Sequence, residues 1–316
     1  MALSYNDLDV AVRKKYLPDL QEQIFISNAF LARLLAKSKI VFDSGLKIVQ
    51  PVIYKMLPGG SYWGMDTFDI SYSQTQTQAE WLWKALYCNV TIPGTDLAIA
   101  EGDEKIMGLL ESKMETAQMT MDELLSTMLF GDGTGNSNKD FDGLANAVDD
   151  GTNYPSYGNL NRVSDATWWI AQYSATGGPV TVDLINQMLG LTTIGTRKVD
   201  LMMTSQQIYD KVWARVQPAQ RFFAEKGPNA DIASVGFSGI EFNGHCAMVV
   251  DNHCPPGTIY FLNTDYWKLI INKNKNFTWT SEKTPTDQDA YVRQLLTMGN
   301  LICTQPRLQG ALINLA

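Results

Sequence analysis

The sequence has few of the residues from which metal sites, disulfide frameworks and nucleic-acid surfaces are built. Its 316 residues include two histidines and four cysteines, and 25 lysines and arginines are outnumbered by 33 aspartates and glutamates, so the net charge is −8. Proteins that hold nucleic acid through its phosphates need clustered Lys and Arg. The acidic balance therefore argues against a surface that binds nucleic acid tightly.

Long hydrophobic runs and targeting segments are also missing. No apolar run approaches the ~18–20 residues that span a bilayer, and the first ten residues, "MALSYNDLDV", contain no basic segment followed by an apolar one. Cys88, Cys246, Cys254 and Cys303 form no short-loop framework. We expect a soluble protein made in a reducing cytosol, with enough apolar residues for roughly two domains.

Residues 45–92 differ from the rest of the chain because they alternate with period two. "LKIVQPVIYKM" predicts a strand, "LPGGSYWG" a turn, and "ISYSQTQTQAEWLWKALYCNVTI" a long returning strand. The apolar phase of the returning strand shifts near Leu86, which predicts a bulge there. The QTQTQ portion is polar on both faces, and a two-stranded hairpin is marginal alone in water. Two interpretations remain open: a flexible surface hairpin, or an arm that reaches a neighbouring subunit.

The clearest helix is predicted over residues 102–129. A rod of that length measures about 42 Å at ~1.5 Å per residue. "LFGDGTGNS" follows it, and a phosphate-binding glycine loop would instead follow a strand and open a helix. We therefore predict Gly131 to be the left-handed C-cap of the helix. The apolar stripe consists of Ile106, Leu110, Met114, Ala117, Met121, Leu124 and Met128.

Helices and short strands interleave without βαβ regularity in the remainder, which predicts an α+β protein. Thr181 is expected to cap one short helix, and Thr204 with Gln207 to open another as a capping box. A helix is also expected near the N-terminus, in "LPDLQEQIFISNAFLARLLAKSK".

Two His–Cys pairs are the one arrangement that suggests a metal. His245 precedes Cys246 and His253 precedes Cys254, but neighbours on a strand point to opposite faces, and zinc ligands are normally separated by two to five residues. A metal-dependent enzyme built on this hairpin is the distant alternative. No nucleophile motif such as G-x-S-x-G is present, so we expect no enzyme, no metal and no cofactor.

The succession of several blocks resembles the major capsid proteins of tailed bacteriophages. These blocks are "GDGTGNSNKDFDGL", "NLNRVSDATWWIAQ", "YDKVWARVQPAQRF", "GIEFNGHCAMVVDNHCPPGTIYFLNTDYWKL" and "MGNLICTQPRLQGAL". The resemblance implies an N-terminal arm and helix over residues 1–44, an extended loop over 45–92, and an axial domain over 180–272. It also implies a peripheral domain over 93–179 and 273–316 that contains a spine helix at 102–129.

The function that the resemblance implies is a coat subunit that assembles as pentamers and hexamers into an icosahedral shell around double-stranded DNA. Its location would be the virion after assembly in the host cytoplasm, and its other partners would include scaffolding, portal and decoration proteins. Because the subunit is acidic, such a shell would not bind the enclosed DNA tightly. The alternative is a nanocompartment of the same fold around a protein cargo.

The resemblance also implies that the extended loop lies over an adjacent subunit. Some family members link such a loop lysine covalently to an asparagine, for which Lys55 and Asn300 are the candidates, although no motif surrounds Asn300. The expected subunit-interface residues are Tyr54, Lys55, Tyr62, Trp63, Gln74, Gln76, Gln78, Trp81 and Trp83.

Overall fold

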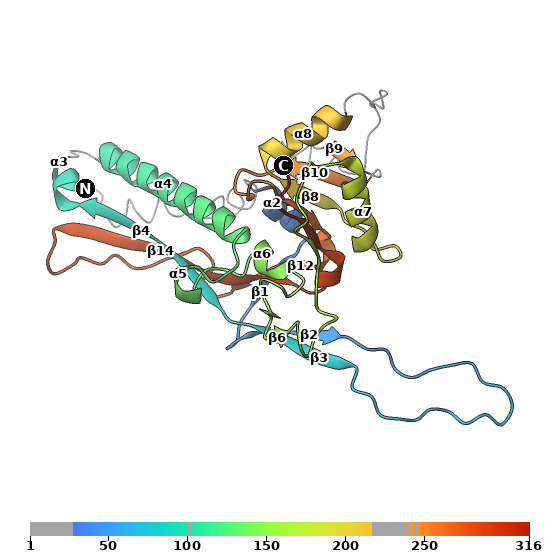
Figure 1. Cartoon of the computed structure of the whole chain (residues 1–316). Helices are drawn as coiled ribbons and strands as arrows, with labels where there is room; N and C mark the ends of the chain where they lie inside the picture. The colour runs from blue at the N-terminus through green and yellow to red at the C-terminus, as the bar shows by residue number, and fades with distance from the viewer. Residues whose placement is uncertain (1–27, 100–102, 217–239, 243–244) are drawn as a thin grey trace.

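The computed structural model describes residues 28–99, 103–216, 240–242 and 245–316. It has an elongated part built on a long sheet and a long helix, a second part above one end of that sheet, and an arm that projects away from both (Figure 1). None of its helices in these ranges is long and apolar enough to cross a membrane. The fold is α+β, as the sequence predicts.

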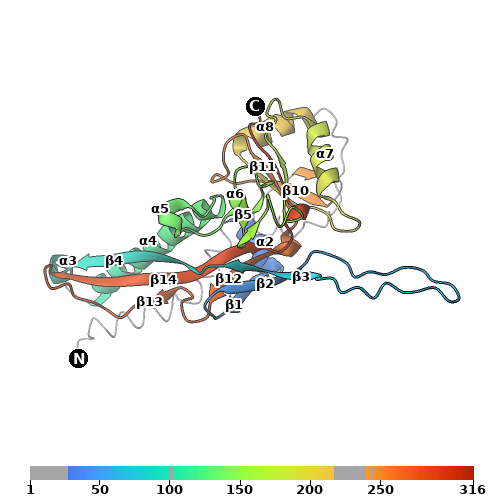
Figure 2. The ribbon, with the colours of Figure 1, turned by 60° about the horizontal axis from the view of Figure 1, so that its bottom comes forward.

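The elongated part is organised by a five-stranded sheet. Strand β14 pairs antiparallel with β4 along ten positions and with β12 beyond it, and β1 lies parallel to β12. Figure 2 shows β4 and β14 running side by side along this part. The strands are β1 (Ile40–Asp43), β4 (Lys84–Pro93), β12 (Trp267–Asn272), β13 (Thr278–Trp279) and β14 (Ala290–Cys303).

Helix α4 (Asp103–Leu129) packs against β4 and corresponds to the long helix predicted from the sequence. Met114, Ala117 and Met121 of the predicted stripe are buried, whereas Leu124 and Met128 are only half-buried. Leu125 and Leu129 are buried in their place, so the buried face of the last two turns lies one position further along than the predicted stripe. The side chains of Ile106 and Leu110 lie outside the described residues.

The shift in apolar phase near Leu86 comes from a break between two strands and not from a bulge. Strand β3 (Gln76–Trp81) pairs with β2 (Ile48–Ile53), the chain leaves the ladder at residues 82–83, and β4 then joins β14. Ala79 and Trp81 are buried on one side of the break, and Leu86, Cys88 and Ile92 on the other. The predicted extended loop at 45–92 is therefore divided, because its last nine residues, 84–92, belong to a strand of a different sheet.

The second part contains a six-stranded sheet and two helices with their own core cluster. Its strands are, in sheet order, β7 (Gln172–Ser174), β15 (Gly310–Leu312), β11 (Ile259–Leu262), β8 (Leu201–Thr204), β10 (Cys246–Val250) and β9 (Ile240–Phe242). The helices are α7 (Val182–Thr192) and α8 (Gln206–Val216). The sheet takes β7 and β15 from outside residues 180–272, and β12 from inside that range lies in the other sheet.

The two predicted helix caps in this part have different outcomes. The hydroxyl of Thr181 accepts a hydrogen bond from the N–H of Leu184 at 3.2 Å, so this cap is confirmed. The capping box at Thr204 is wrong, since Thr204 ends strand β8 and its hydroxyl donates to the carbonyl of Thr258. Hydrogen bonding to β11 and β10 takes precedence over the local helix signal.

Short elements connect these parts. Asn28 caps α2, accepting from the N–H groups of Phe30 and Leu31; the earlier residues of the predicted N-terminal helix, 17–27, lie outside the described ranges. The remaining elements are α2 (Ala29–Ala36), α3 (Gly94–Ile99), α5 (Gly135–Asn138), α6 (Leu144–Ala147), β5 (Ser156–Tyr157), β6 (Leu160–Asn161), η2 (Thr264–Tyr266) and η3 (Pro306–Leu308).

Gly131 follows the long helix but is not its left-handed cap. Its N–H donates to the carbonyl of Met128 at 3.0 Å, and its φ is not positive. The left-handed conformation occurs at Gly133, with φ of +79°, and again at Asn136 and Ser137. The first left-handed residue after the helix therefore lies two positions later than the sequence predicts.

Candidate assembly surfaces

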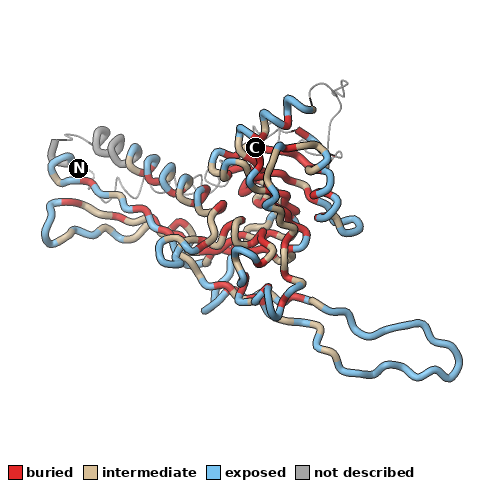
Figure 3. The backbone as a smooth tube through the Cα atoms, in the orientation of Figure 1, coloured by how far each residue is buried: buried red, intermediate tan, exposed pale blue. Residues whose placement is uncertain are grey.

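The arm is a two-stranded ribbon that ends in a long exposed loop. Strands β2 and β3 pair from Ile48 opposite Trp81 to Ile53 opposite Gln76, and residues 54–75 beyond them form no strand. Figure 3 shows most of this loop as exposed, projecting away from the buried centre of the chain. Its exposed large apolar side chains are Met56, Leu57, Tyr62, Trp63, Met65, Phe68, Ile70 and Tyr72. So many exposed apolar side chains on one loop indicate an interaction site.

Two acidic residues shape the tip of the arm. Asp66 accepts the N–H of Trp63 through Oδ2 at 2.9 Å, and Asp69 accepts the N–H of Ser71 through Oδ1 at 2.9 Å. The hydrogen bonds from Ser71 lower the pKa of Asp69. Tyr62 and Phe68 meet edge to face across the loop. These contacts are local turns, and the aromatic faces around them stay exposed to solvent.

The base of the arm is held by Trp81. The indole is 3% exposed and meets the ring of Tyr157 edge to face at 5.5 Å. The backbone of Gly158 lies against it: a Cβ at Gly158 would stand 2.8 Å from Trp81 Cζ2, and its φ is +59°. The N–H of Glu80 donates to the carbonyl of Gly158. Trp81 is therefore packed in the core of its own chain, and its contact with another subunit stays a prediction.

The other predicted interface residues divide by exposure. Tyr54 is half-buried and stacks on Trp168, and Trp83 is half-buried with its Nε1 donating to the carbonyl of Gly45. Both stay near the body of the chain. The fully exposed ones are Lys55, Tyr62, Trp63, Gln74, Gln76 and Gln78. These six remain predicted contacts with another subunit.

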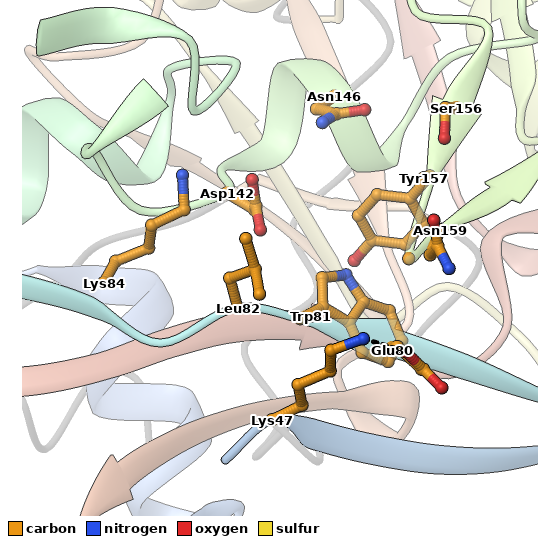
Figure 4. Close-up of a pocket in the computed structure, with 11 residues that line it drawn as sticks. Lys47, Glu80, Trp81, Leu82, Lys84, Asp142, Asn146, Ser156, Tyr157 and Asn159 are labelled. Atoms are coloured by element: carbon orange, nitrogen blue, oxygen red, sulfur yellow. Dashed lines mark hydrogen bonds and ion pairs between the residues drawn. The ribbon is translucent and has the colours of Figure 1, made fainter. Parts of the chain in front are cut away.

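A cavity of about 390 Å³ lies at the base of the arm (Figure 4). It brings together the arm strands, the loop before α6 and the turn between β5 and β6. Two of the lining residues each have a polar atom, Trp81 Nε1 and Asn146 Oδ1, that is buried and finds no hydrogen-bond partner within the part of the chain that is described. The lining residues are Lys47, Glu80, Trp81, Leu82, Lys84, Asp142, Asn146, Ser156, Tyr157, Gly158 and Asn159.

Charges around the cavity are mostly paired within the chain. Lys47 Nζ lies 2.7 Å from Glu80 Oε2, and Lys84 Nζ donates to the carbonyls of Gly133 and Asn138. Burial raises the pKa of Asp142 against the opposing effects of its bond to Asn300 and the charge of Lys84. Sequence reasoning missed this cavity, because its residues share no motif.

Asn300, a candidate for the cross-link, is buried in its own chain. It is 0% exposed, its Oδ1 accepts the N–H of Asp142 at 2.9 Å, and its Nδ2 donates to Asp142 Oδ2 and the carbonyl of Leu82. The amide is thus enclosed and hydrogen-bonded in its own chain. The link between Asn300 and Lys55 of another subunit stays a prediction, and it would require this amide to give up these hydrogen bonds.

The two His–Cys pairs are not assembled into one site. Cys246 is buried in the core of the six-stranded sheet, whereas Cys254 packs in the larger core cluster. His253 contacts Glu123 and Asp251, at 3.1 Å and 3.3 Å. Burial raises the pKa of the Cys254 thiol to about 12, which disfavours the thiolate that binds metals. Within the described residues no three His, Cys, Asp or Glu side chains form a metal-binding group.

The comparisons with known proteins show the fold of this chain. No family model and no curated protein matches its sequence. Solved structures match along most of its length. The capsid asymmetric unit of cyanophage A-1(L) is 13% identical, covers 91% of this chain and 93% of its own, and gives a TM-score of 0.67. The capsid of a native GTA particle is 11% identical, covers 90% of both chains and gives 0.59.

A shell protein that is not from a phage matches as well. The SrpI encapsulin complex of Synechococcus elongatus PCC 7942 is 12% identical, covers 90% of this chain and 87% of its own, and gives a TM-score of 0.55. The chain therefore has the fold of tailed-phage major capsid proteins, which is also the fold of this encapsulin.

Proposed function

We propose that the chain is the coat subunit of a tailed phage, which assembles as pentamers and hexamers into an icosahedral shell around double-stranded DNA. The exposed arm carries this proposal. Eight large apolar side chains of its loop are each more than half exposed in this chain. Burying them against another subunit removes this apolar area from water, which favours association. The shared fold with capsid subunits supports the proposal.

The charge of the chain fits the interior of a DNA container. With a net charge of −8, the subunit repels the phosphate backbone on average and does not fix it in place. Under this proposal the protein acts in the virion after assembly in the host cytoplasm. It has no catalytic role, and scaffolding, portal or decoration proteins are its further partners.

A nanocompartment shell is the second candidate, because the encapsulin matches over 90% of this chain. Both candidates require self-assembly, and they differ in cargo. A phage shell encloses nucleic acid, whereas a nanocompartment encloses protein.

The experiment is to express the full chain and measure the mass of the purified protein by size exclusion with light scattering. Shells of megadalton mass in negative-stain images are the expected result. Nuclease-resistant DNA within particles from infected cells supports the phage capsid, and a co-purifying protein cargo without nucleic acid supports the nanocompartment. A protein of about 35 kDa at every concentration and salt tested contradicts both.

A further inference from the structure

The chain changes its pairing partner where the arm joins the long sheet. Strand β4 pairs with β14 as far as Lys84, which lies opposite Gly299, and β3 pairs with β2 as far as Trp81. Residues 82–83 between them, which we call the branch point, belong to neither ladder. The side chain of Leu82 is 61% exposed, so its burial does not hold the branch point in place. Whatever fixes the conformation of these two residues therefore sets the direction in which the arm leaves the sheet.

A side chain takes over at the branch point, where the backbone ladder ends. Asn300 follows Gly299 on β14, and its backbone pairs with Ile270 of β12. The Nδ2 of Asn300 donates to the carbonyl of Leu82 at 3.1 Å. The connection between β14 and the chain that enters the arm thus continues for one more residue, through an amide side chain instead of the backbone.

All four hydrogen-bonding positions of this amide are occupied. Oδ1 accepts the N–H groups of Asp142 and Leu301, each at 2.9 Å, and Nδ2 donates to Asp142 Oδ2 at 2.7 Å as well as to Leu82. An asparagine amide has two donor and two acceptor positions, so none is left over. The side chain is 0% exposed. A buried polar network that is fully satisfied is rigid and specifies one arrangement of the groups that it joins.

The other end of this network lies in the segment 130–143, which follows helix α4. Asp142 belongs to this segment, and Lys84 contacts it too, because its Nζ donates to the carbonyls of Gly133 and Asn138. Figure 4 shows Asp142 and Lys84 together above the strand that carries the branch point. The amide of Asn300 therefore connects the branch point to the segment after the long helix.

We propose that Asn300 is the positioning residue of the arm: its amide fixes the branch point and thereby the direction in which the ribbon leaves the long sheet. Trp81 packs the ribbon against Tyr157 and Gly158, whereas Asn300 holds the entry to the ribbon. Without the amide, the branch point is free to turn about its two residues. This direction is a property of the single chain, and only its consequence for assembly rests on the proposed function.

The test measures the direction of the arm by electron paramagnetic resonance in the full chain, below the concentration at which light scattering detects particles. One spin label is attached through Gln76→Cys at the far end of the ladder, and the other through Met119→Cys on α4. Both native side chains are exposed. The four native cysteines are buried, so the labels react with the introduced ones. A ladder of six residues spans about 20 Å, so a turn of about 15° at its base moves the label by about 5 Å.

Two substitutions remove the contact, and a third is the matched control. Asn300→Ala removes the whole amide, and Asn300→Asp keeps the size of the side chain but removes the donor to Leu82. Asn28→Ala also removes a buried amide, which caps α2 and bonds to Asp251 instead. Circular dichroism checks the folding of each variant, and Asn300→Asp decides if Asn300→Ala does not fold.

We expect one narrow distance distribution for the wild type and for Asn28→Ala. Both Asn300 variants should give a broader distribution whose mean is shifted by about 5 Å or more. A wild-type distance in a folded Asn300 variant, a broad distribution in the wild type, or the same broadening in Asn28→Ala overturns the proposal.

Assembly gives a second readout for the same variants. An arm that points in the required direction about a tenth of the time raises the critical concentration for assembly about tenfold. Failure of the wild-type chain to assemble counts against the proposed function and not against the role of Asn300, because the distances are measured on unassembled subunits.

Discussion

At the residue scale, the position of the arm depends on Gly158, whose backbone lies against the indole of Trp81. Gly158 has φ of +59°, and a Cβ there would lie 2.8 Å from Trp81 Cζ2. Alanine therefore meets both backbone strain and overpacking, and we expect Gly158→Ala to lower the free energy of unfolding by about 2 kcal/mol. Urea denaturation measures the change. Gly60→Ala is the control, because a Cβ at Gly60 meets nothing within 4 Å; equal effects in both variants would contradict this role.

His253 is a second single residue that joins distant elements, because it lies in the connection between β10 and β11 and contacts Glu123 of the long helix α4. Burial lowers its pKa, but the carboxylates of Glu123 and Asp251 together outweigh that effect and raise it. The stabilisation is thus fully present below the unfolded pKa of about 6.5 and is lost as the pH rises through the higher folded value.

The His253→Gln variant should therefore lose more stability relative to the wild type at about pH 5.5 than at about pH 8.5. The difference should stay under about 1 kcal/mol, because Glu123 is largely exposed and its charge is screened. Urea denaturation of both proteins at the two pH values measures it. A larger loss at the higher pH would show that the imidazole acts in its neutral form.

Residue roles were harder to predict than residue exposure. The period-two pattern correctly marks the side chains of β3 that face inward, but it does not say what they face. Trp81 meets Tyr157 and Gly158, which lie far along the chain, and Asn300 meets Asp142. No local signal carries such pairings, so the cavity and the burial of Asn300 required the three-dimensional structure.

The arm can be tested as an element by shortening it. Deleting residues 74–78 would remove part of the β2–β3 ladder, since Gln76 to Gln78 pair with Ile53 to Pro51. Replacing residues 56–73 by a short glycine-rich turn leaves that ladder intact. We expect the thermal unfolding midpoint of the subunit to stay the same, because the loop contributes no buried apolar side chain, while shells no longer form. Light scattering and calorimetry measure the two effects, and normal shells from this variant would refute the role of the arm.

Elements were predicted well where their periodicity was long and continuous. The 27-residue helix α4 follows from its stripe, and the phase shift before Leu86 marks a real discontinuity. Its interpretation as a bulge was wrong because period alone cannot tell an inserted residue from a change of partner strand. Period alone also cannot show which strands share a sheet. Strands β12 and β15 therefore each pair across the predicted boundary between the axial and peripheral domains.

At the scale of the whole molecule, the net charge of −8 sets how subunits approach one another. Like-charged copies repel over a Debye length, about 10 Å at 0.1 M ionic strength and shorter as salt is added. The apolar loop contacts are not screened. Raising the salt from about 0.05 M to about 0.5 M should therefore lower the critical concentration for assembly. Light scattering across this range measures it, with Asp69→Asn as a variant of reduced charge that should need less salt. A critical concentration that rises with salt would mean that exposed opposite charges, and not the apolar arm, dominate the contacts between subunits.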